Sequence, residues 1–105
     1  WQHVRDIAQA FRKATFADET ALSQRVYNVR GVLATIREAA NTVREILPDA
    51  DLEVSDDGEL PWTQNLDMTA ARTDLGYEVE YNLETGFRSY INTLREEHGL
   101  DPARQ

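Results

Sequence analysis

The feature that most constrains the fold is the amphipathic segment between Thr35 and Pro48. Thr35 and Glu38 have the T-x-x-E spacing of a capping box, in which each side chain bonds to the backbone amide of the other residue. Apolar residues then recur at helical spacing until Pro48, which cannot continue a helix. These apolar residues are Ile36, Ala39, Ala40, Val43, Ile46 and Leu47. The pattern predicts a helix whose apolar face needs another element to cover it.

Three further segments have helical patterns. Residues from about 5 to 16 carry apolar side chains at the i, i+3, i+4, i+7 spacing of one helix face. Those side chains are Val4, Ile7, Ala8, Phe11 and Ala14. Residues 69–75 predict a short helix closed by Gly76, whose missing Cβ suits a left-handed cap. Asn82 can cap a last helix, and Gly99 follows its final turn.

Short β-branched and aromatic segments between the helices predict strands. "RVYNV" (residues 25–29) and "DLEV" (residues 51–54) have the composition of short strands, and "WQHV" (residues 1–4) could be the end of another. Strands separated by helices of about ten or more residues favour parallel crossovers. We therefore predict an α/β fold, with a small parallel sheet of about two or three short strands packed with about four helices. Its sheet edges would be exposed unless another domain covered them.

Charge and composition narrow the range of partners. The chain carries 19 acidic and 11 basic residues, for a formal charge of -8, so phosphate backbones and anionic lipid would repel it. We expect neither nucleic acid nor a membrane as a partner, and no apolar run reaches the roughly 20 residues of a membrane span. The absence of cysteine favours the cytoplasm. Since the chain begins with Trp1 rather than methionine, we expect further sequence upstream.

The sequence contains no recognised catalytic or metal-binding constellation. His3 and His98 are far apart and fit no paired-ligand spacing, so no metal site is predicted. The acidic run at residues 49–59 does not match a calcium loop, because Val54 occupies the sixth position, where that loop needs glycine. The glycines are too scattered for a phosphate cradle.

Four residues are candidate substrate contacts. Trp62 and Gln64 lie in "ELPWTQNLD", which combines apolar area with hydrogen-bonding groups as binding loops do, although Trp62 could instead fold over the core. Arg30 follows "VYNV" at the carboxyl end of a predicted strand, where α/β folds place ligands, or it is an ordinary surface residue. His3 has either a structural role or a substrate contact.

Several short motifs occur in a characteristic order. H-V-x-D-x-A lies at residues 3–8, Y-N-V at residues 27–29 and D-x-x-x-A-R-x-D-L-G-Y at residues 67–77. A Leu-Glu-x-Gly signature follows within "YNLETGFRSYI" at residues 81–91. In order and spacing the chain resembles, over nearly its whole length, the carboxyl-terminal portion of extended short-chain dehydrogenases/reductases, the NAD-dependent epimerase/dehydratase family.

The resemblance implies that catalysis belongs to sequence outside this chain. Enzymes of that family bind NAD(P) on an amino-terminal Rossmann domain through a glycine-rich loop, and they move a proton with a Tyr-x-x-x-Lys pair. The only lysine here is Lys13, and Gln9 stands four positions before it, so that pair is missing. Residues 1–105 would then be a single substrate-binding domain without catalytic, cofactor-binding or metal-binding residues. Its partners would be the missing Rossmann domain, a small-molecule substrate and, for the isolated chain, a second copy.

The substrate is less closely defined by the resemblance. Relatives that act on uridine-diphosphate sugars commonly carry an arginine just ahead of the segment that resembles "GELP", where this chain has Asp56 and Asp57. Carboxylates there would repel a diphosphate. The pattern W-x-x-x-L-D at residues 62–67 is closer to a branch that includes L-threonine dehydrogenase. We expect a sugar, a nucleotide sugar or a small polar alcohol as substrate, and the alternative is a free-standing acidic protein-interaction domain without catalysis.

Overall fold

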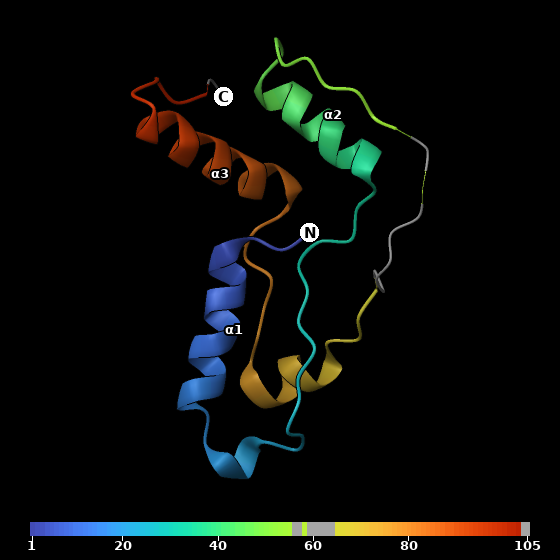
Figure 1. Ribbon diagram of the computed structural model, residues 1–105. Helices are drawn as coiled ribbons and strands as arrows, with labels where there is room; N and C mark the ends of the chain where they lie inside the picture. The colour runs from blue at the N-terminus through green and yellow to red at the C-terminus, as the bar shows by residue number, and fades with distance from the viewer. Residues whose placement is uncertain (56–57, 59–64, 104–105) are drawn as a thin grey trace. The chain divides into compact units, whose positions relative to one another are not determined.

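The computed structural model describes residues 1–55, 58 and 65–103, which form helices joined by extended segments (Figure 1). The chain divides into two compact units. Among the described residues, unit 1 comprises residues 1–33 and 65–81, and unit 2 comprises residues 34–55, 58 and 82–103. Trp62, Gln64, Asp56 and Asp57, which the sequence analysis singled out, lie outside the described residues.

Unit 1 contains helix α1 (Val4–Phe16), the 3₁₀ turn η1 (Glu19–Ala21) and the π-helical turn η2 (Ala71–Leu75). Its buried core is small and combines α1 with η2 and the residues that flank η2. The buried core residues are Ala10, Met68, Ala71 and Tyr77, and Tyr27, Val29, Leu75 and Val79 pack against them from partly buried positions. The extended segments of unit 1 therefore belong to its core through their side chains.

Unit 2 contains helices α2 (Ile36–Ile46) and α3 (Leu83–Glu97), which pack against each other. Their buried residues are Ala39, Ile46 and Ile91. The predicted capping box of α2 is confirmed, since the Glu38 amide donates to Thr35 Oγ1 at 3.0 Å and the Thr35 amide donates to Glu38 Oε2 at 3.1 Å. Asn82 caps α3 as predicted, because its Oδ1 accepts from the Thr85 amide at 2.8 Å.

The predicted glycine caps are confirmed as well. Gly76 has φ 69° and its amide donates to the Arg72 carbonyl, which ends η2. Gly99 also has φ 69°, and the Leu100 amide returns to the Arg95 carbonyl at 2.8 Å. This left-handed conformation carries little cost for glycine, so both positions end a helix where the sequence predicts an end.

The prediction of an α/β fold with a small parallel sheet is wrong. None of the residues described, 1–55, 58 and 65–103, lies in a β-strand. Residues 25–29 and 51–54 are not helical, but no backbone hydrogen bonds pair either segment with another in this part of the chain. A strand exists only when a second strand supplies the ladder, and side-chain composition alone cannot provide that partner.

One strand-like contact occurs where Trp1 meets Val32. The Trp1 amino group donates to the Val32 carbonyl at 3.1 Å, and the Val32 amide donates to the Trp1 carbonyl at 2.7 Å. Such an exchange is the unit of an antiparallel ladder, but the ladder does not continue in the described residues. Gly31 permits the close approach, since a Cβ there would lie 2.0 Å from the Trp1 carbonyl oxygen.

Candidate functional site

The polar side of α1 binds the backbone of an extended segment, residues 76–81, which runs beside it (Figure 1). Asp6 has no exposed surface. Its carboxylate accepts hydrogen bonds from the amides of Glu80 at 3.0 Å and Tyr81 at 3.2 Å. Burying a carboxylate is costly unless it is hydrogen-bonded, and these two amides supply the compensation.

Gln9 and Lys13 continue the same side of α1. The Gln9 side-chain amide donates to the Glu78 carbonyl at 2.8 Å and accepts from the Glu78 amide at 3.1 Å, as a neighbouring strand residue would. Lys13 Nζ donates to the Gly76 carbonyl at 2.7 Å. Helix side chains thus take the place of a strand ladder, which explains how residues 76–81 satisfy part of their backbone without a sheet.

Tyr77 links this segment to the other extended part of unit 1. Its side chain is fully buried, its hydroxyl donates to the Arg30 carbonyl at 3.0 Å and it accepts from Gln2 Nε2 at 3.0 Å. Burial raises the pKa of the Tyr77 hydroxyl, so the phenol stays protonated. Tyr77 therefore joins Gln2 and Arg30 through hydrogen bonds at a buried position of unit 1.

His3, one of the predicted substrate contacts, caps the start of α1. Its Nδ1 accepts from the Arg5 amide at 3.0 Å. Its ring stacks on Tyr81, with centroids 3.9 Å apart and planes 7° apart. Arg5 Nη1 also donates to the Tyr81 hydroxyl at 3.1 Å, so His3 and Arg5 together hold the end of the 76–81 segment.

Arg30, another predicted contact, donates to backbone carbonyls. Its Nε reaches the Leu66 carbonyl at 3.0 Å and its Nη1 reaches the Gly31 carbonyl at 2.9 Å. The guanidinium is half-buried and fixes residue 66 beside the 30–31 backbone. Arg30 and His3 thus both lie in unit 1, but they have different neighbours and do not form a shared site through these contacts.

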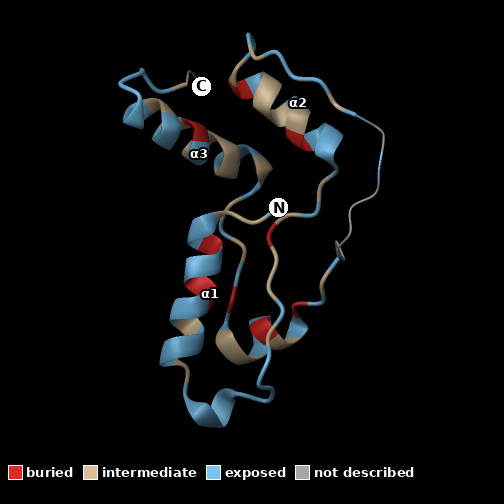
Figure 2. Ribbon diagram, in the orientation of Figure 1, coloured by how far each residue is buried: buried red, intermediate tan, exposed pale blue. Residues whose placement is uncertain are grey.

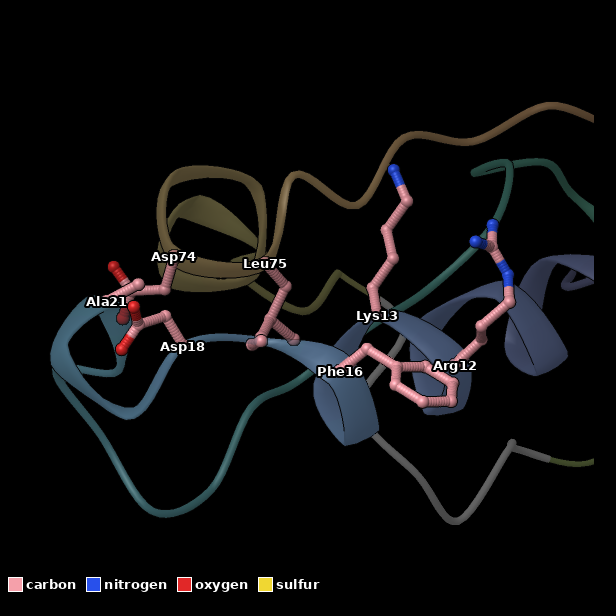
Figure 3. A pocket seen from close by; sticks show the side chains of 8 residues that line it. Arg12, Lys13, Phe16, Asp18, Ala21, Asp74 and Leu75 are labelled. Atoms are coloured by element: carbon pink, nitrogen blue, oxygen red, sulfur yellow. The ribbon is translucent and has the colours of Figure 1, made fainter.

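A pocket of about 280 Å³ opens at the end of α1, where it meets η1 and η2 (Figure 3). Its lining residues are Arg12, Lys13, Phe16, Ala17, Asp18, Ala21, Asp74 and Leu75. Figure 3 shows the carboxylates of Asp18 and Asp74 together on one side of the pocket. The charged ends of Arg12 and Lys13 point away from those carboxylates, and Phe16 and Leu75 supply apolar surface between the two ends.

Hydrogen bonds hold both pocket carboxylates in place. Asp74 accepts from the amide and hydroxyl of Ser23 and from the Tyr27 hydroxyl at 2.7 Å. The hydrogen bond from the Ser23 hydroxyl is the largest cause that lowers the pKa of Asp74, and the hydrogen bond from the Tyr27 hydroxyl is the second. The Thr20 amide and hydroxyl likewise lower the pKa of Asp18. Two anionic carboxylates beside apolar surface can bind a small polar or cationic group, but they do not constitute a nucleophile with its base.

Sequence analysis did not single out Asp18, and it included Asp6 and Asp74 only as members of motifs, without the contacts that they make. The D-x-T spacing at residues 18–20 was the available signal for Asp18, because an aspartate there can accept from the amide two residues on. Asp74 accepts hydrogen bonds from Ser23 and Tyr27, which lie 51 and 47 residues earlier in the chain. No local pattern records such a contact.

The apolar face of α1 is turned outward. Val4 is 70% exposed, Phe11 is 69% exposed and Ile7 is 38% exposed, whereas Asp6 and Gln9 are buried. Figure 2 shows the buried positions of α1 as separate patches on a helix that is otherwise mostly exposed. An amphipathic helix normally buries its apolar stripe, so α1 presents to its surroundings the surface that a helix ordinarily hides.

No protein-family profile and no curated protein matches the chain. None of the helices in the described part of the chain is both long and apolar enough to cross a membrane. Within residues 1–55, 58 and 65–103, no group of three or more His, Cys, Asp or Glu side chains is arranged to hold a metal ion.

Proposed function

We propose that this chain is the substrate-binding part of an NAD(P)-dependent epimerase, dehydratase or dehydrogenase, and that it is inactive alone. The observation that carries the proposal is the outward apolar face of α1, formed by Val4, Ile7 and Phe11. Fully burying one such side chain stabilises a protein by roughly 1.5–3 kcal/mol. A side chain that stays in water does not contribute this free energy. A covering partner would recover that free energy, and we propose the missing Rossmann domain as that partner.

Contacts between the motif segments support the resemblance behind this proposal. Asp6 of H-V-x-D-x-A binds the amide of Tyr81, where the closing segment begins. Tyr27 of Y-N-V donates to Asp74 of the D-L-G-Y run at 2.7 Å. The resembling segments therefore depend on one another in unit 1, which is the expected behaviour of motifs that define one structural domain.

The proposed division of labour follows from the residues present. The cofactor, NAD or NADP, and the proton-transfer pair belong to the remainder of the enzyme, because this chain has Gln9 where that pair would need a tyrosine. The proposed substrate is a sugar, a nucleotide sugar or a small polar alcohol. Trp62 and Gln64 remain the residues that we propose to line the substrate site of the whole enzyme. Arg30 and His3 would act by fixing the backbone around the substrate. The cysteine-free sequence supports a cytoplasmic location.

The reading frame that encodes the chain provides the test. The protein expressed from the whole frame should convert a polar alcohol or sugar in a reaction that depends on NAD or NADP, and the 105-residue chain alone should not. Substituting Trp62 or Gln64 with alanine in the whole protein should raise KM without unfolding it. A frame that encodes only these residues, or a whole protein without nicotinamide-dependent turnover, would overturn the proposal and favour a free-standing acidic interaction domain.

A further inference from the structure

The pocket at the end of α1 carries opposite charges at its two ends (Figure 3). Asp18 and Asp74 lie together on one side, and the charged ends of Arg12 and Lys13 lie away from them. Every residue that lines the pocket belongs to unit 1, so this chain contains the whole of it. A ligand of the pocket therefore meets negative charge at one end and positive charge at the other.

Each carboxylate of the pocket keeps one oxygen for a ligand. Asp74 accepts its hydrogen bonds from Ser23 and Tyr27 through Oδ2. Asp18 accepts from the amide and hydroxyl of Thr20 through Oδ1, at 3.0 and 2.9 Å. In the part of the chain that the structure describes, no hydrogen bond or ion pair reaches Asp74 Oδ1 or Asp18 Oδ2. The hydrogen bonds to the other oxygens lower the pKa of both carboxyls, so both are anionic at neutral pH.

Arg12 supplies the positive charge at the opposite end of the pocket. Its guanidinium makes no hydrogen bond or ion pair with any residue that the structure describes, so its five N–H groups are available to a ligand. Lys13 differs, because its Nζ donates to the Gly76 carbonyl at 2.7 Å. Between the two charged ends, Phe16 is 82% exposed and Leu75 is half-buried. These two side chains form an apolar wall.

The size and the charges of the pocket narrow the class of ligand. Its volume of about 280 Å³ lies just below the roughly 300–1,000 Å³ of sites for drug-sized molecules, so the ligand is small. Calcium takes about six to eight oxygen ligands, and two carboxylates supply too few of them. A diamine would place its second ammonium against Arg12, where like charges repel. A ligand with one positive and one negative end avoids both difficulties.

We infer that this pocket binds a small zwitterion in which a short apolar chain joins a primary ammonium to a carboxylate. The ammonium donates to Asp74 Oδ1 and Asp18 Oδ2. The apolar chain packs on Phe16 and Leu75, and the ligand carboxylate accepts from the Arg12 guanidinium, whose planar fork matches two oxygens at once. The inference does not depend on the proposed function, because it uses only residues of this chain.

An NMR titration of the 105-residue chain tests this inference. The zwitterionic probes are 4-aminobutanoate and 6-aminohexanoate, and butylammonium and butanoate each lack one of the two charged ends. The amide resonances of residues 12–21 and 74–75 report binding at the pocket. Since ion pairs in contact with water are weak, we expect a dissociation constant of about 1–10 mM for the better zwitterion. Butylammonium, butanoate and 1,4-diaminobutane should each bind at least about threefold more weakly.

Matched substitutions separate the pocket from the general charge of the chain. Asp18→Asn removes one pocket charge but keeps an oxygen that can cap η1, and Asp51→Asn makes the same change at an exposed residue of unit 2. Arg12→Gln removes the opposite charge, and Arg25→Gln is its exposed control in unit 1. Asp18→Asn and Arg12→Gln should each weaken binding of the zwitterion at least about threefold, while the two controls leave it unchanged.

Three results would overturn the inference. The first is the absence of shifts at the pocket resonances up to about 50 mM of either zwitterion. The second is equal weakening of binding by Asp18→Asn and Asp51→Asn. The third is tighter binding of 1,4-diaminobutane than of either zwitterion, because attraction to the net charge of -8 would then account for the binding.

Discussion

Replacing Asp6 with asparagine tests whether α1 holds residues 76–81 through the buried carboxylate. Asp6 is fully buried and accepts from the Glu80 and Tyr81 amides at 3.0 and 3.2 Å. Asparagine has nearly the same shape but only one acceptor oxygen, so its NH₂ group must face one of the two amides. Losing one hydrogen bond to a charged group and leaving one donor unsatisfied should cost about 2–4 kcal/mol.

The assay for Asp6→Asn is amide hydrogen exchange combined with urea unfolding. Exchange at the Glu80 and Tyr81 amides should accelerate about 30-fold or more, since each 1.4 kcal/mol corresponds to about tenfold. Asp18→Asn is the control, because Asp18 is exposed and caps only the short η1 turn. If Asp6→Asn lost less than about 0.5 kcal/mol and left both amides protected, the carboxylate would not be what fixes this segment.

Two further substitutions test other contacts within unit 1. The pKa of Asp74 is lowered by its hydrogen bonds from Ser23 and Tyr27, so the stability it contributes is present above the ordinary carboxyl range and is lost as pH falls through the folded-state pKa. Asp74→Asn should therefore flatten the acid limb of a plot of thermal midpoint against pH, and an unchanged limb would contradict the assigned role. Gly31→Ala should destabilise unit 1 by about 1–3 kcal/mol in urea unfolding, because the new Cβ would lie 2.0 Å from the Trp1 carbonyl oxygen; a loss below about 0.5 kcal/mol would show that this approach is not required.

Helix ends were predictable from the sequence because their determinants are local. Thr35 and Glu38 satisfy each other within one turn, and Asn82 needs only the amide of Thr85. Gly76 adopts the left-handed conformation that its lack of a side chain allows. In each case the residues that decide the outcome lie within a few positions of one another, so no tertiary information was needed.

The strands and the orientation of α1 were not predictable in this way. "RVYNV" has the composition of a strand, but its pairing depends on a partner that the composition does not specify. The spacing of Val4 and Phe11 defines a face of α1, but not whether that face is turned inward. The polar side of the helix is turned inward, where Gln9 forms hydrogen bonds with Glu78, and these residues are 69 positions apart.

The candidate site could be anticipated only in part. Arg30 and His3 stay predicted substrate contacts, and the structure shows that Arg30 donates to the Leu66 carbonyl and that the His3 ring stacks on Tyr81. Asp18 and Asp74 line the pocket at the end of α1, and Asp74 accepts a hydrogen bond from the distant Tyr27. Sequence spacing identifies residues that contact near neighbours in the chain. It does not identify sites whose residues come together only in the folded structure.

Thiol labelling at position 11 tests most directly whether a partner covers α1. The chain has no cysteine, so Phe11→Cys introduces a single thiol on the outward face, and Val26→Cys, at a residue 75% exposed outside α1, provides the control. Alkylation is followed by peptide mass spectrometry in the 105-residue chain and in the protein from the whole reading frame. We expect labelling at position 11 to slow at least about tenfold in the whole protein while position 26 changes little. Equal labelling rates at position 11 in the two proteins would contradict the account.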